Sequence, residues 1–153
     1  YDGERFVEAA SGLRYPNGVN VSKDGKTLYV ASTTGGTVSV FRIDPESPVL
    51  EERGAIETGT GLDNIEIDRE DALWIGAHPK LLTFVQHTSD ASRIAPSQVI
   101  RITAPGSDAP RVEEVLLSLG EDLSGSSVAA VRGERLLVGS VMDDGILDCR
   151  ISH

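Results

Sequence analysis

Apolar and polar residues alternate with a period of two over much of the chain, and no stretch shows a sustained helical period. In the first such stretch, Val19 and Val21 alternate with small or polar residues, and residues 23–26 then supply an Asp-Gly pair typical of a hairpin turn. Apolar positions resume at residues 28–31 and again, after a Gly-Gly turn, at residues 38–43. The pattern predicts a three-stranded β-meander.

The same strand–turn–strand–turn–strand pattern occurs twice more, over residues 65–86 and 128–151. In the second copy the third strand is expected at residues 81–86, where apolar residues are frequent. Two polar, proline-containing stretches in that part of the chain, residues 88–96 and 105–110, are expected to be loops. The chain is therefore predicted to be an array of three similar units.

Repeated antiparallel units of this size are typical of the blades of a β-propeller. Closed propellers have about four to eight blades, so three blades leave strand edges unpaired at both ends. We predict an all-β fold in which residues 1–153 are the C-terminal part of a single β-propeller domain of which an N-terminal portion completes the ring. The chain starts at Tyr1 rather than Met, and we expect that an upstream segment has been removed.

Charge and composition narrow the range of partners. The chain has 14 Lys and Arg against 24 Asp and Glu, which gives a formal net charge of −10. Such a surface repels nucleic acids and anionic membranes. No apolar run approaches the roughly 18 residues needed to cross a bilayer. Cys149 is the single cysteine, so no disulfide can form within the chain.

Polar residues precede the first apolar position of each copy: Asn17-Gly18, Asp63-Asn64 and Ser126-Ser127. The first strand of each propeller blade lines the central channel, so these side chains are expected to converge near the axis. A carboxylate, carboxamides and hydroxyls are oxygen ligands that suit Ca²⁺, whereas Zn²⁺ prefers nitrogen and sulfur. Asn and Asp before a strand are also ordinary turn residues, and the sequence pattern leaves both interpretations open.

An ordered set of short motifs resembles the paraoxonase/arylesterase family. The motifs lie at residues 15–26, 62–65, 76–79, 97–102, 125–129, 137–141 and 147–149. The resemblance extends from about Tyr15 to the C-terminus and aligns with the C-terminal part of such proteins. It implies a six-bladed propeller with two calcium ions in its tunnel, one structural and one that polarises the carbonyl of a lactone or an aryl ester.

The same resemblance implies roles for individual residues. Asn17, Asp63 and Asn64 match ligands of the catalytic calcium, and Asp63 is also a candidate for taking a proton from the attacking water. The remaining calcium ligands and a histidine dyad belong to the N-terminal half in that family, so we expect this chain to be inactive without that half. Metal ligation lowers the basicity of a carboxylate, which weighs against Asp63 as the base.

The three histidines differ in their interpretation. His78 matches the His-Pro pair of the family and is a candidate catalytic residue, either as a polar wall of the tunnel or as a proton-handling group. The alternative is a histidine that caps a strand end and satisfies backbone groups. His87 and His153 match no motif and are expected at the surface.

Cys149 has three interpretations: a buried inert thiol, a nucleophile for which no base is evident, or half of a disulfide. In the paraoxonases a cysteine at this position pairs with one near the N-terminus. That resemblance implies a partner cysteine in the N-terminal portion of the same polypeptide, and an oxidising, extracellular compartment.

Two other functions fit the same features. A gluconolactonase-like enzyme would keep calcium and act on sugar lactones, and a non-catalytic propeller would use its face only for binding. Calcium-dependent turnover of lactones separates the enzymes from the binding module. A preference for apolar over sugar lactones separates the two enzymes.

Overall fold

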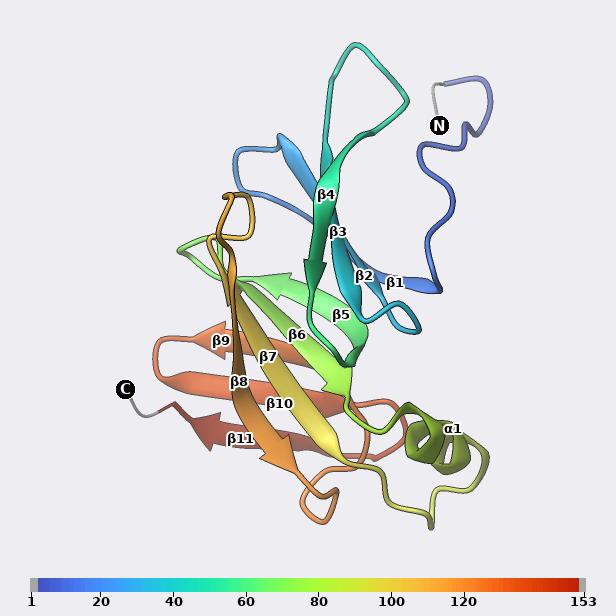
Figure 1. Ribbon diagram of the computed structural model, residues 1–153. Helices are drawn as coiled ribbons and strands as arrows, with labels where there is room; N and C mark the ends of the chain where they lie inside the picture. Colours follow the sequence, from blue (N-terminus) through green and yellow to red (C-terminus); the bar gives the residue numbers. More distant parts are fainter. Residues whose placement is uncertain (1–2, 152–153) are drawn as a thin grey trace.

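The computed structural model describes residues 3–151 and consists of strands with a single helix in that range (Figure 1). The elements are β1(Pro16–Val21), β2(Thr27–Ser32), β3(Thr37–Arg42), β4(Glu51–Glu57), β5(Gly61–Ile67), β6(Leu73–His78), α1(Leu81–Ser89), β7(Ser97–Thr103), β8(Arg111–Ser118), β9(Ser126–Arg132), β10(Arg135–Ser140) and β11(Ile146–Arg150). None of this described chain forms a helix long and apolar enough to span a membrane.

The strands form three antiparallel sheets that follow one another along the chain (Figure 1). Their strand orders are β1-β2-β3-β4, β5-β6-β7-β8 and β11-β10-β9, so neighbouring strands are also consecutive in sequence. The sheets coincide with the three predicted copies, which confirms an all-β propeller segment of about three blades. The segment is open, because these sheets do not close into a ring.

The strand predicted at residues 81–86 is wrong. These residues begin helix α1, and the third strand of the second sheet is β7, which pairs with β6. Apolar residues at positions 81, 82, 84 and 85 resemble a short buried strand, and periodicity alone does not distinguish such a run from a helix. The predicted loop at residues 105–110 is confirmed, whereas that at 88–96 starts only after the helix ends.

The outer strands β4 and β8 are additions to the predicted three-strand units. Most of their side chains are exposed, so they lack the alternation of buried and exposed positions that marks the inner strands. They complete four-stranded sheets, and the third sheet has no equivalent strand beside β11 in residues 3–151.

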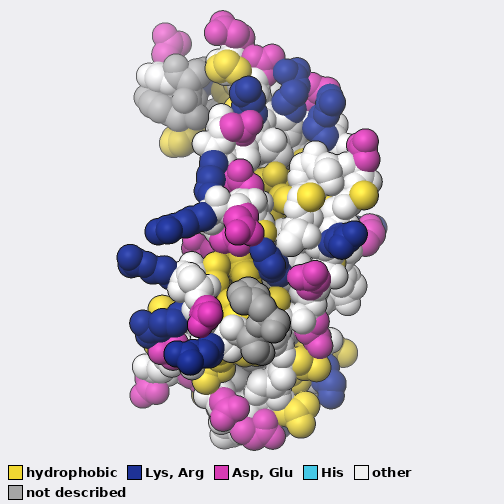
Figure 2. Space-filling model, turned by 90° about the vertical axis from the view of Figure 1, so that its left-hand side faces the viewer, with side chains coloured by type: hydrophobic (Ala, Val, Ile, Leu, Met, Phe, Trp, Pro, Cys, Tyr) yellow, Lys and Arg dark blue, Asp and Glu magenta, His cyan; other side chains and the backbone are white. Residues whose placement is uncertain are grey.

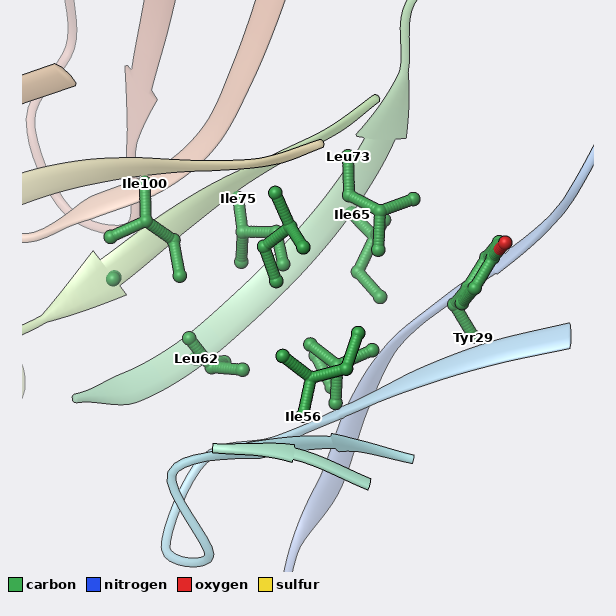
Figure 3. Packing of buried hydrophobic residues seen from close by; sticks show 11 residues of the cluster. Tyr29, Ile56, Leu62, Ile65, Leu73, Ile75 and Ile100 are labelled. Atoms are coloured by element: carbon green, nitrogen blue, oxygen red, sulfur yellow. The ribbon is translucent and has the colours of Figure 1, made fainter. Parts of the chain in front are cut away.

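Two apolar clusters hold adjacent sheets together. Figure 3 shows the first, in which Tyr29 and Ile56 of the first sheet lie opposite Leu62 and Ile75 of the second. The second cluster joins the second and third sheets and includes Trp74, Val99, Leu136 and Val138. Every residue of β6 is buried because alternate side chains of this strand face different neighbouring sheets. Strands β5 and β6 are thus fixed from both sides.

Candidate functional site

The three polar pairs singled out in the sequence lie at irregularities of the innermost strands. Pairing of β1 with β2 shifts between Pro16 and Val19, and pairing of β5 with β6 shifts between Leu62 and Ile65. In β9 the shift falls between Ser126 and Val128, which are opposite Ser140 and Gly139. Each is a β-bulge, in which extra residues leave the regular ladder. The bulges occupy equivalent places in all three sheets.

Two glycines allow the backbones of adjacent sheets to approach closely beside the bulges. A Cβ added to Gly18 would lie 2.3 Å from the carbonyl oxygen of Asp63. A Cβ added to Gly76 would lie 2.4 Å from the carbonyl oxygen of Ser127. Real Cβ atoms do not approach backbone atoms this closely, so only glycine fits at either position. The predicted site residues of β1 and β5 are therefore close to one another, and those of β9 pack against β6, the strand that pairs with β5.

The two carboxamides are held by hydroxyl groups. Asn17 Nδ2 donates to Thr33 Oγ1 over 3.3 Å, and Asn64 Nδ2 donates to Ser127 Oγ over 2.9 Å. Both asparagines are exposed, and no hydrogen bond within residues 3–151 occupies the Oδ1 atom of either. The arrangement leaves two carbonyl-type oxygens available for a ligand.

Asp63 is buried beside His78. Asp63 Oδ2 lies 3.3 Å from His78 Nε2. The His78 ring stacks on Phe84 of α1, with centroids 3.5 Å apart and planes inclined by 14°. Its Nδ1 is buried and has no hydrogen-bond partner within the described chain. A donor left in that state costs free energy, so the proton belongs on Nε2, which donates to Asp63.

This contact distinguishes the two interpretations of His78. Its side chain meets a carboxylate rather than a backbone group, so it does not act as a strand cap. The predicted catalytic roles of Asp63 and His78 stay predictions, but the structure brings both together with the bulges of β1 and β5.

The two serines of the third pair serve different purposes. Ser126 is buried, accepts from the Gln98 backbone N–H and donates its hydroxyl between the carbonyls of Ala77 and Gln98. It is thus a structural link between sheets and has no free oxygen for a metal. Ser127 instead contacts the candidate ligand Asn64.

His87 is buried, and its predicted surface position is wrong. It lies on the inner side of α1, where its Nδ1 bonds to the Arg93 carbonyl over 2.8 Å and lies 3.5 Å from Ser124 Oγ. The prediction failed because α1 was taken for a strand and a loop, which hid the helical spacing between Phe84 and His87. The predicted surface position of His153 lies outside the described residues.

The donor set fits a hard cation such as Ca²⁺. It comprises one carboxylate and two carboxamide oxygens, and Ca²⁺ takes six to eight oxygen ligands in total. Residues 3–151 contain no group of three or more His, Cys, Asp and Glu side chains placed to hold a metal. A complete calcium site would therefore need Asn17, Asp63 and Asn64 together with further oxygen ligands.

Comparison with known proteins decides the family. The family model described as Arylesterase matches residues 1–151. The chain belongs to the arylesterase family. Serum paraoxonase/arylesterase 2 of Rattus norvegicus and serum paraoxonase/arylesterase 1 of Homo sapiens are each 32% identical to it. Each match covers 92% of this chain and 39% of the relative, so the chain spans about two fifths of these proteins' length.

Solved structures support the fold. A candidate 6-phosphogluconolactonase from Bacteroides fragilis matches 88% of this arylesterase-family chain and 34% of its own, with a TM-score of 0.58 and 18% identity. A second, from Bacteroides uniformis, matches 90% of this chain and 37% of its own, with a TM-score of 0.59 and 16% identity. At these identities the likeness concerns the fold alone.

Proposed function

We propose that this chain forms part of a calcium-dependent hydrolase of lactones or aryl esters. The observation that supports the proposal is the close approach of the β1 and β5 backbones at the bulges that carry Asn17, Asp63 and Asn64, together with the buried contact between Asp63 and His78. Membership of the arylesterase family supports a lactonase or esterase over a binding module. The names of its relatives, serum paraoxonase/arylesterase, agree with this class of chemistry.

In this proposal Asn17, Asp63 and Asn64 hold the cation. When bound, Ca²⁺ supplies a Lewis acid for the substrate carbonyl and for the oxyanion that develops on it. His78 Nε2–H occupies Asp63 Oδ2 and leaves Oδ1 free, since no hydrogen bond within residues 3–151 uses that atom. His78 thus orients the carboxylate, and Phe84 fixes the plane of the histidine ring. Asp63 Oδ1 is therefore the carboxylate oxygen that would hold the cation.

The test is turnover of apolar and sugar lactones by the polypeptide that supplies the remaining blades together with this chain. Activity should require calcium and should be lost in Asp63→Asn, which keeps the side-chain shape but removes the charge. A loss of 100-fold or more is expected because the substitution removes the one charged group among the three proposed ligands. Asp24→Asn is the matched control, because Asp24 is a carboxylate in an exposed turn.

Two results would contradict the proposal: turnover unchanged by removing calcium, or equal activities of the Asp63→Asn and Asp24→Asn variants. Faster turnover of sugar lactones would favour the gluconolactonase-like alternative. Calcium binding without turnover of any lactone or ester would favour the non-catalytic module.

We also propose that the partner of this chain is the N-terminal portion of the same polypeptide. The third sheet has three strands where the others have four, and β11 has a free edge among the described residues. A groove of about 980 Å³ lies between the second and third sheets, next to β8 and β11, and its lining includes Val115, Leu116 and Cys149. Figure 2 shows hydrophobic side chains between charged ones on the face of the molecule that bears the C-terminal end. A fourth strand would fill this space.

A partner cysteine on that strand would join Cys149, which is half-buried and free in the described chain. Intact mass before and after reduction tests this link, and Cys149→Ser is the control. A single species that is unchanged by reduction and whose thiol is alkylated by iodoacetamide would refute the disulfide. An extracellular location is part of the same proposal and is supported by the serum origin named for the relatives.

A further inference from the structure

Thr33 joins two of the candidate ligand strands through one hydroxyl group. It follows β2 directly and its side chain is buried between the first and second sheets, with 7% of the residue exposed. Thr33 Oγ1 donates to the carbonyl of Leu62, the residue before Asp63, over 2.6 Å. The same oxygen accepts from Asn17 Nδ2 over 3.3 Å.

The direction of these two hydrogen bonds fixes the orientation of Asn17. A hydroxyl group has one proton, and a carbonyl oxygen can only accept, so the Thr33 proton is committed to Leu62. Towards Asn17 the hydroxyl can then only accept, which requires that the carboxamide present its NH₂ group. A flipped carboxamide would place two acceptors against each other. Thr33 therefore keeps Asn17 Oδ1 on the side away from itself.

The backbone of Thr33 makes further links to the same strands. Its N–H donates to the carbonyl of Tyr15, two residues before Asn17, over 3.0 Å. Its carbonyl oxygen lies 3.2 Å from the point that a Cβ on Gly61 would occupy, two residues before Asp63. The spacing between the β1 and β5 bulges is thus set in part by one residue that belongs to neither strand.

We propose that Thr33 is a positioning residue for the cation site: it holds the Asn17 carboxamide with Oδ1 available and ties the β1 bulge to the β5 bulge. This inference rests on the proposed function, because it assumes that Asn17 is a ligand. Partners that orient metal ligands typically account for 10–100-fold in metal affinity. Nothing in the short motifs marks Thr33, which is a polar residue at the end of a strand.

The test compares Thr33→Val, which removes the hydroxyl at constant shape, with Thr33→Ser, which retains it. Thr58→Val is the matched control, since Thr58 Oγ1 also donates to a carbonyl, that of Gly36, over 2.8 Å and away from the bulges. Calcium affinity is measured by isothermal titration calorimetry in the polypeptide that includes the remaining blades, and thermal unfolding is measured without calcium.

Thr33→Val should bind calcium about tenfold more weakly or worse, Thr33→Ser should stay close to the unsubstituted protein, and Thr58→Val should lose stability without losing calcium affinity. Equal calcium affinities of Thr33→Val and Thr58→Val would overturn the role of Thr33. Asp63→Asn distinguishes a failure of the proposed function from a failure of the inference about Thr33. If it binds calcium normally, the proposed function fails, and if it alone loses affinity, only the inference about Thr33 fails.

Discussion

Substituting Gly18 with alanine tests how closely the first two sheets approach at the candidate site. A Cβ at this position would lie 2.3 Å from the Asp63 carbonyl oxygen and 2.8 Å from both Asn64 Cα and Ile65 N. All three atoms belong to the backbone, so no side chain can rotate away and the strands must separate. The perturbation therefore acts on the distance between β1 and β5.

The expected cost lies at the upper end of the range for overpacked cores, about 3 kcal/mol. With a urea dependence of about 2 kcal/mol per molar for a domain of this size, the unfolding midpoint should fall by about 1.5 M. The assay is urea unfolding followed by the fluorescence of Trp74, which is buried between the second and third sheets. The slope should stay unchanged if both proteins unfold cooperatively.

Gly145→Ala is the matched control. An added Cβ at Gly145 meets nothing within 4 Å, and the residue is outside the left-handed region of backbone conformation. The control should shift stability by no more than about 0.5 kcal/mol. If Gly18→Ala unfolded at the same urea concentration as Gly145→Ala, the two strands would not pack as closely as described, and the convergence of the site residues would lose its basis.

Two further predictions concern titratable groups. Burial opposes ionisation of Asp68, but hydrogen bonds from Trp74 Nε1 and two backbone N–H groups, together with Arg101, hold its pKa below the ordinary 3.8. The stability that the ionised carboxylate contributes is therefore complete above about pH 4 and is lost as the pH falls through the lowered pKa. In acid unfolding, Asp68→Asn should start with a free energy of unfolding about 2 kcal/mol lower and should depend less on pH over that window. Burial, with nearby Asp148 and Asp122, raises the pKa of the Cys149 thiol. If this thiol is free, it should react with iodoacetamide at pH 7 more slowly than a small-molecule thiol of ordinary pKa. Equal rates would contradict the described burial.

Much of the fold was predictable because the inner strands carry an unambiguous signal. Positions such as Val19, Ile65 and Val128 lie in strands whose alternation and polar turns leave few other interpretations. The outer strands β4 and β8 were not predictable in this way, because exposed side chains remove the alternation. Helix α1 was missed since four apolar residues in a short segment suit either a strand or a helix.

The candidate site was predictable only in outline. Equivalent places in three copies identified Asn17, Asp63 and Asn64, and the family resemblance identified the same residues. The bulges depend on pairing with the neighbouring strand, and the sequence of one strand does not specify that pairing. The contacts of His78, and the link through Thr33, depend on how two sheets pack, so no local pattern could have revealed them.

The hydrogen bonds around the site join different sheets, which couples its formation to blade packing. Thr33 links Asn17 of the first sheet to Leu62 of the second, and Asn64 of the second sheet bonds to Ser127 of the third. Separated sheets would therefore present none of these carboxamides in a fixed orientation. A cation that binds only the packed arrangement must, by linkage, stabilise the same inter-sheet contacts. Once its concentration exceeds the dissociation constant, this stabilisation grows with the logarithm of the ratio between the two. Calcium that serves the proposed reaction would then also hold the blades together.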